Sequence, residues 1–199
     1  MSKSILKVLN VLIFFALMFV AARLWAADTY QIDPNHSSLG FAIKHLTVST
    51  VKGEFTDYSG TIQFDLNDLA SFMADITIKA TSVDTHQEKR DEHLRTTDFF
   101  EVEKYPDISF KSNKLTAQGD GYNITGSLNF HGVTKEITIP VKISGPVTSP
   151  MGGNVIGLSG ETIINRKDYG MNYNKTLDTG GLILSDAVKV SIELEASHK

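Results

Sequence analysis

The stretch GYNITGSLNFHGVTKEITIPVKIS, residues 121–144, contains two runs in which apolar and polar side chains alternate. Alternation with a period of two is typical of a β-strand that has one buried face. The residues HGVTK lie between the runs, and Gly132 can take the positive φ that a tight hairpin turn requires. The stretch therefore predicts two adjacent antiparallel strands, each with one apolar face and one polar face.

The same alternation extends over most of the chain. It recurs in segments 39–45, 51–55, 60–66, 72–80, 107–115, 154–165 and 187–196. About eight antiparallel strands of this kind can form a sandwich or close into a barrel. Closure removes exposed sheet edges, which favours a barrel. The interior of an eight-stranded barrel is either filled by side chains or wide enough for one small ligand.

Glycines interrupt several of these strands, at Gly40, Gly53, Gly126, Gly157 and Gly160. A glycine inside a strand permits a sharp bend and also removes a side chain from the wall. The glycines therefore indicate either bends alone or bends together with unfilled interior space.

The segment HQEKRDEHLRTTDFF, residues 86–100, breaks the alternation and favours a short helix. Asp84 or Thr85 is placed to cap it, and Glu88 stands where a capping box has an acid. Its two histidines are seven residues apart, and Lys89 occupies the first ligand position of an inverted zinc motif. We therefore expect a solvated helix rather than a metal or catalytic site.

The first 26 residues have the features of a secretory signal peptide. Lys3 and Lys7 precede an uninterrupted apolar run at 11–22, and small residues surround Ala26. The run is shorter than the about 20 apolar residues of a membrane span. We predict cleavage after Ala26, to within one residue, and a single mature domain at 27–199.

Charge and composition exclude several classes of function. The formal net charge is −4, and removing residues 1–26, with three basic residues and no acid, makes it −7. Such a charge disfavours binding to nucleic acid or to an anionic membrane surface. The chain has no cysteine, which excludes disulfides and thiol nucleophiles. It also has no nucleophile elbow, phosphate-binding glycine loop or dinucleotide fingerprint, so no catalytic site is predicted.

The segment INRKDYGMNYN, residues 164–174, combines charged and aromatic residues. We expect Arg166 and Asp168 to form a charge-assisted pair that fixes a loop. Tyr169, Met171 and Tyr173 alternate beside them, and such side chains suit either core packing or an adaptable apolar wall.

Four stretches together resemble the YceI-like family of bacterial periplasmic proteins. They are HSSLGFAIKHLTVSTVKGEFTDYSGTI (36–62), TSVDTHQEKRDEHLRTTDFFEVEKYPDISFKS (81–112), ITGSLNFHGVTKEITIPV (124–141) and INRKDYGMNYN (164–174). The resemblance implies an all-β fold, an extended eight-stranded antiparallel lipocalin-like barrel with a short helical lid near residues 86–100. It also implies a periplasmic protein that binds, sequesters or transports a long-chain isoprenoid lipid, a polyisoprenoid or an isoprenoid quinone, without catalysis. Neither a cofactor nor a metal is expected.

We predict that the lid segment closes an apolar pocket. Its charged residues Glu88, Lys89, Arg90 and Asp91 are expected to face water or tie the helix to the rim. The predicted ligand-binding residues are Phe41, Ile43, Phe55, Phe64, Ile76, Ile78, Leu94, Phe99, Phe100, Phe110, Ile124, Leu128, Ile139, Ile164, Tyr169 and Met171.

The expected partner is an isoprenoid or another amphiphilic lipid, and transient membrane contact and a homodimer are both left open. Two alternatives also stay open. One is an enzyme acting on a lipid-like substrate through His93 with Asp91 or Glu92. The other is a barrel without a cavity that serves as a structural interaction module.

Overall fold

The computed structural model describes residues 27–176 and 182–198. The predicted signal peptide, 1–26, and its cleavage site lie outside the described residues. The strands are β1 (Asp28–Ile32), β2 (Ser38–His45), β3 (Ser49–Phe55), β4 (Tyr58–Phe64), β5 (Met73–Lys79), β6 (Val83–Asp84), β7 (Asp107–Gln118), β8 (Gly121–Phe130), β9 (Val133–Thr148), β10 (Asn154–Asn165) and β11 (Leu184–His198). The helices are α2 (Glu88–Arg95) and the 3-10 turns η1 (Pro34–His36), η2 (Leu69–Ser71), η3 (Ala80–Ser82) and η4 (Arg166–Tyr169).

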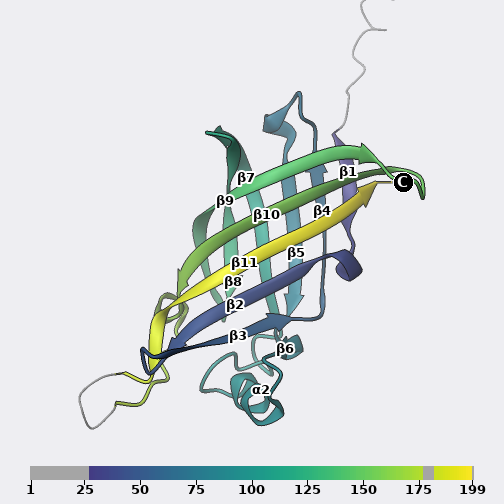
Figure 1. Cartoon of the computed structure of the whole chain (residues 1–199). Coiled ribbons are helices and arrows are strands. Elements are labelled where there is room, and N and C mark those ends of the chain that lie inside the picture. Colours follow the sequence, from purple (N-terminus) through teal and green to yellow (C-terminus); the bar gives the residue numbers. More distant parts are fainter. Residues whose placement is uncertain (1–26, 177–181, 199) are drawn as a thin grey trace, which may run out of the picture.

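The described strands form one antiparallel sheet that closes on itself (Figure 1). The ring has eight strands in the order β1-β4-β5-β7-β8-β9-β10-β11, and β11 returns to β1 through the pairs Gln31↔Ser197 and Ile32↔Ala196. β2, β3 and β6 continue the sheet from the remaining length of β11. The predicted eight-stranded barrel with one short α-helix is therefore confirmed.

The hairpin of β8 and β9 forms as its sequence predicts. Phe130 pairs with Val133, which leaves a two-residue turn of His131 and Gly132 with φ values of 51° and 74°. Along β8, Ile124 and Leu128 are buried on the inner face, as the alternation requires.

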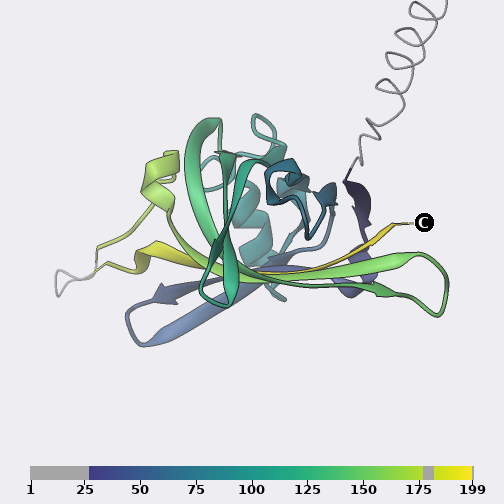
Figure 2. The ribbon, with the colours of Figure 1, turned by 90° about the horizontal axis from the view of Figure 1, so that it is seen from above.

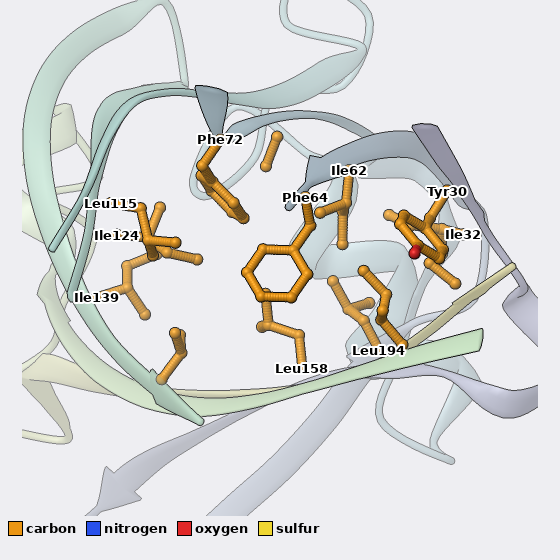
Figure 3. Packing of buried hydrophobic residues seen from close by; sticks show 14 of the residues in the cluster. Tyr30, Ile32, Ile62, Phe64, Phe72, Leu115, Ile124, Ile139, Leu158 and Leu194 are labelled. Atoms are coloured by element: carbon orange, nitrogen blue, oxygen red, sulfur yellow. The ribbon is translucent and has the colours of Figure 1, made fainter. Parts of the chain in front are cut away.

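One end of the barrel is filled by its own side chains. Tyr30, Ile62, Phe64 and Phe72 are each at most 3% exposed, and Figure 3 shows the Phe64 ring in the middle of this packed cluster. Burying such a side chain contributes about 1.5–3 kcal/mol. Phe64, predicted as a ligand contact, belongs to this packed end, where its ring lies 6.4 Å from that of Phe72.

The helix α2 lies at the opposite end, below the strands in Figure 1 and across the ring seen from above in Figure 2. Its cap differs from the predicted one, because the Gln87 side chain accepts a hydrogen bond from Arg90 N at 2.6 Å. The Thr85 hydroxyl is not the cap, because its oxygen accepts from Arg90 Nε at 2.7 Å while the Thr85 N–H and O–H donate to the buried carboxylate of Asp91. Asp91 is therefore buried and ties the helix to Thr85, which is one of the two roles predicted for the charged residues of this segment.

In the part of the chain that the structure describes, no helix combines the length and the apolar character needed to cross a bilayer.

Candidate ligand-binding cavity

A cavity of about 550 Å³ lies between the open end of the barrel, α2 and the segment that follows η4. Its walls come from β2, β3, β8, β10 and β11, and the lid segment covers them. Its apolar lining residues are Phe41, Ile43, Val51, Phe55, Leu94, Phe99, Phe100, Phe130, Ile164, Met171, Tyr173, Ile183, Leu184, Val188 and Val190. We call this space the outer chamber.

A second, smaller space of about 140 Å³ lies deeper in the barrel, and we call it the inner chamber. Five side chains line both chambers, namely Phe41, Phe55, Phe130, Ile164 and Val190. The apolar lining is therefore continuous from the mouth to the interior. It ends where the packed cluster begins, since core residues such as Ile62, Leu158 and Leu194 also border the inner chamber.

Most of the residues predicted as ligand contacts line these chambers. Those that line the outer chamber are Phe41, Ile43, Phe55, Leu94, Phe99, Phe100, Ile164 and Met171. Of these, Phe41, Phe55 and Ile164 also line the inner chamber. The others that line the inner chamber are Ile76, Ile78, Phe110, Ile124, Leu128 and Ile139. Phe64 and Tyr169 lie instead in packed clusters. Contact of the lining residues with a ligand stays a prediction.

The wall also includes residues that the sequence did not single out as contacts. Phe130, Tyr173, Val188 and Val190 all line the outer chamber. Val188 and Val190 share one face of the alternating segment 187–196, so that pattern could have identified them. Nothing in the local sequence of Tyr173 distinguishes a lining residue from a core residue.

Two of the strand glycines make room for aromatic rings of the wall. A Cβ at Gly126 would lie 2.6 Å from Cζ of Phe110, and one at Gly53 would lie 2.5 Å from Cζ of Phe41. The space left by these two glycines is therefore occupied by the tips of the Phe110 and Phe41 rings.

An aromatic contact links the lid to the opposite rim of the outer chamber. The Tyr173 ring centroid lies 5.3 Å from that of His93 on α2 and 5.0 Å from that of Phe99. His93 and Phe99 are themselves 5.1 Å apart, in an edge-on arrangement. Such pairs contribute about 0.5–1.5 kcal/mol each beyond the area they bury. These aromatic contacts therefore join the lid to the rim on the side of Tyr173.

Arg166 anchors the other side of the mouth. It is 3% exposed and donates to the carbonyl oxygens of Ser185 (3.0 Å), Met171 (2.6 Å) and Tyr173 (2.8 Å). Burial lowers the pKa of its guanidinium, an effect that nearby Asp186 opposes. The predicted pair with Asp168 is wrong.

Two longer-range ion pairs replace the Arg166–Asp168 pair. Arg166 contacts the carboxylate of Asp186 at 3.4 Å. Asp168 instead points toward Lys135, at 3.6 Å. The buried guanidinium therefore joins η4 to the start of β11 rather than bracing its own turn.

The polar groups at the mouth are mainly basic. The lysine, arginine and histidine side chains that line the outer chamber are His45, Arg90, His93, Arg166 and Lys175, and among the described residues no carboxylate lines it. Arg90 is held in place because its Nε and Nη2 donate to Thr85 Oγ1 and Thr85 O, at 2.7 and 2.8 Å. An apolar chamber with a basic mouth suits an amphiphile whose head is polar.

The acid–base pair proposed for an enzyme does not assemble around His93. Its Nε2 lies 2.8 Å from Oδ2 of Asp98, outside the helix, whereas Asp91 is bound to Thr85. Glu92 is exposed. The His93–Asp91 pairing is therefore not the arrangement of this structure.

The chain matches the YceI-like domain model over residues 30–196. Protein YceI of Escherichia coli O17:K52:H18 is 41% identical over 171 residues, which cover 85% of this chain and 87% of that protein. The crystal structure of a Campylobacter jejuni YceI protein is 38% identical, with a TM-score of 0.67 over 78% of this chain and 90% of the other. A polyisoprenoid binding domain from Saccharophagus degradans shares the fold, with a TM-score of 0.62 and 19% identity over 85% of this chain and 98% of the other.

Proposed function

The chain belongs to the YceI-like family, and from this premise we propose that it binds and carries a long-chain isoprenoid lipid, a polyisoprenoid or an isoprenoid quinone, in the periplasm. The observation that carries the proposal is the continuous apolar lining of the two chambers, closed at one end by packed side chains. The name of the Saccharophagus degradans neighbour supports the choice of an isoprenoid. The leader-like sequence of residues 1–26 supports export.

The physical reason for such a carrier is the cost of hydrating an isoprenoid tail. Each CH₂ group left in water costs about 0.8 kcal/mol, so a long tail does not cross an aqueous compartment unshielded. An apolar cavity resembles the bilayer interior, so transfer between them is nearly balanced. Loading and release then require opening of the contacts across the mouth, those of Tyr173 with His93 and Phe99.

The orientation of the ligand follows from the distribution of charge. The inner chamber is lined by apolar side chains and one threonine, Thr162, together with Gly40. The basic side chains, Arg90 and Lys175 among them, lie along the outer chamber. The tail therefore enters first, and the polar head stays at the mouth, where it can accept hydrogen bonds.

We propose binding rather than catalysis. The family and its polyisoprenoid-binding neighbour favour a binding protein. The alternative of a barrel without a cavity does not agree with an outer chamber of about 550 Å³.

A charge placed on the wall of the inner chamber tests the proposal. Ile76 on β5 lines this chamber, whereas Met73 on the same strand is 55% exposed. Ile76→Asp should abolish uptake of a radiolabelled polyprenol, because the carboxylate would face the tail without a partner. Met73→Asp, the matched control, should leave uptake unchanged.

Ile124→Asp provides a second test on β8. Ile124 is 4% exposed, so Ile124→Asp is more destabilising than Ile76→Asp. Circular dichroism must therefore first show that each variant is folded. Unchanged uptake in folded Ile76→Asp protein would place the lipid outside the chambers and refute the proposal.

A further inference from the structure

The turn between β2 and β3 has an unusual combination of sequence and conformation. Its central residues Leu46 and Thr47 have φ values of 54° and 62°, in the left-handed region that glycine and asparagine favour. For a β-branched threonine this conformation is costly. The residue that follows, Val48, is 82% exposed. The chain thus uses a strained turn to hold an apolar side chain in solvent.

This turn is fixed to a second exposed apolar residue. Leu46 N donates to Ile183 O at 2.7 Å, and Ile183 N donates to Lys175 O at 3.0 Å. The neighbouring Leu182 is 44% exposed. Figure 1 shows the end of β2 and the start of β11 side by side, at the same end of the molecule. We call Leu46, Val48, Leu182 and Lys175 the mouth tip.

The mouth tip borders the opening of the outer chamber. His45 and Ser49, which flank the turn, both line that chamber, and so do Lys175 and Ile183. The opposite end of the sheet also has an exposed apolar hairpin tip, at Met151, which is 99% exposed. That hairpin joins β9 and β10 and lines neither chamber.

The charge of the turn between β2 and β3 differs from that of the whole chain. Residues 38–53 contain Lys44 and Lys52 but neither Asp nor Glu, although the chain has a net charge of −4. Lys44 and Lys175 are both exposed. Local positive charge beside exposed apolar side chains is the combination that binds an anionic bilayer surface.

We propose that the mouth tip docks on a bilayer containing anionic lipids, with Val48 and Leu182 inserted and Lys44 and Lys175 near the head groups. This inference rests on the proposed carrier function and adds the place where the lipid enters and leaves. Docking in this orientation brings the mouth against the bilayer, so the tail moves between two apolar spaces without crossing water. The net charge of the chain does not prevent it, because interactions between exposed charges more than about 8 Å apart are largely screened at physiological ionic strength, whereas Lys44 and Lys175 would lie close to the head groups.

The absence of cysteine permits a direct test, because one introduced thiol can be labelled alone. Thr47→Cys in the full chain would carry a nitroxide at the mouth tip, and Met151→Cys would carry the same label at the opposite end. We expect vesicles containing phosphatidylglycerol to protect the label at 47 from a water-soluble nickel chelate at least about fivefold, and the label at 151 not at all. Because the readout is local, binding through residues 1–26 does not produce it.

A transfer assay tests the consequence for the cargo. Val48→Asp should slow uptake of a fluorescent polyprenol from anionic vesicles about tenfold, and leave uptake from detergent micelles unchanged. Met151→Asp, the control, should change neither. A label at 47 that stays fully accessible with vesicles overturns the docking proposal, and so does equal uptake by Val48→Asp from vesicles.

Failure of docking and failure of the carrier function can be told apart. Normal uptake from micelles together with an accessible tip would reject docking and leave the carrier function standing. A protected tip in a protein that takes up no polyprenol from any source would support docking and reject the carrier function.

Discussion

Val190 offers a way to separate the two chambers without altering the mouth. It lies on β11, pairs with Phe41 on β2 and Thr162 on β10, and lines both chambers. Val190→Trp would place a large ring at the junction. The inner chamber behind it, about 140 Å³, has room for roughly five water-sized groups at about 30 Å³ each, close to one isoprene unit.

The expected loss of affinity follows from that volume. Five carbons returned to water at about 0.8 kcal/mol each correspond to about 4 kcal/mol, or at most about a thousandfold in Kd. Ligands short enough to fit within the outer chamber should lose little. The variant should therefore bind long and short isoprenoids with nearly equal affinity, whereas the unaltered protein favours the longer one.

The assay is displacement of a fluorescent lipid by isoprenols that differ by one isoprene unit. Ile163→Trp is the matched control, because Ile163 is 72% exposed on β10 and lines neither chamber. A folded Val190→Trp variant whose preference for longer chains matches that of the unaltered protein would refute the view that the chambers form one binding path.

Three further predictions concern the mouth and the surface. Arg166→Met should lower the free energy of unfolding in urea by about 4 kcal/mol, because buried carbonyl groups lose a charged donor. Lys167→Met, at a partly exposed position, should lower it by less than about 1 kcal/mol. Similar losses in both variants would contradict the anchoring role of Arg166. Tyr173→Ala should release bound polyprenol faster, whereas Tyr173→Phe should not, because the ring rather than the hydroxyl contacts the lid. Stopped-flow transfer of the polyprenol to vesicles would measure this rate. The pKa of His36 is raised from 6.5, chiefly by the hydrogen bond of its ring to Asp33. This contact therefore stabilises the fold fully below pH 6.5, and its contribution is lost as the pH rises through the raised pKa. NMR titration of Asp33→Asn should show the His36 pKa falling toward 6.5, and an unchanged pKa would contradict this cause.

The strand pattern was readable from sequence because each strand has one buried face. The hairpin at His131 and Gly132 could be predicted in detail, since its turn chemistry is local. The sequence pattern does not predict β1, although Tyr30 and Ile32 are buried and alternate. Its run is short and follows directly on the leader-like segment. Its role in closing the ring depends on pairing with Ser197 and Ala196, far away in the chain, which no local pattern reveals.

The inward face of each strand could be predicted, but the boundary between packed and hollow regions could not. Phe64 on β4 and Ile76 on β5 both point into the barrel. Phe64 meets Phe72 in the packed end, whereas Ile76 borders the inner chamber. The difference depends on position along the barrel axis and on which rings fill the space, neither of which alternation encodes.

Polar partners were the least predictable part of the site. Arg166 and Asp168 are two residues apart, which suggested a pair, yet the 3-10 turn η4 separates their side chains. Arg166 instead reaches Asp186 and three carbonyl groups, contacts that depend on how β11 returns past the turn. The predicted N-cap of the lid helix is wrong for a similar reason. Thr85 is hydrogen-bonded to Asp91 and Arg90, and Gln87 caps the helix in its place.

The central claim is that the two chambers hold an isoprenoid chain. Mass spectrometry of an organic extract from protein purified gently from cells tests it most directly. We predict a long-chain isoprenoid in near-stoichiometric amount, and its loss from the Ile76→Asp protein prepared in parallel. Repeated recovery of the unaltered protein without lipid, or with a mixture that Ile76→Asp binds equally well, would contradict the account.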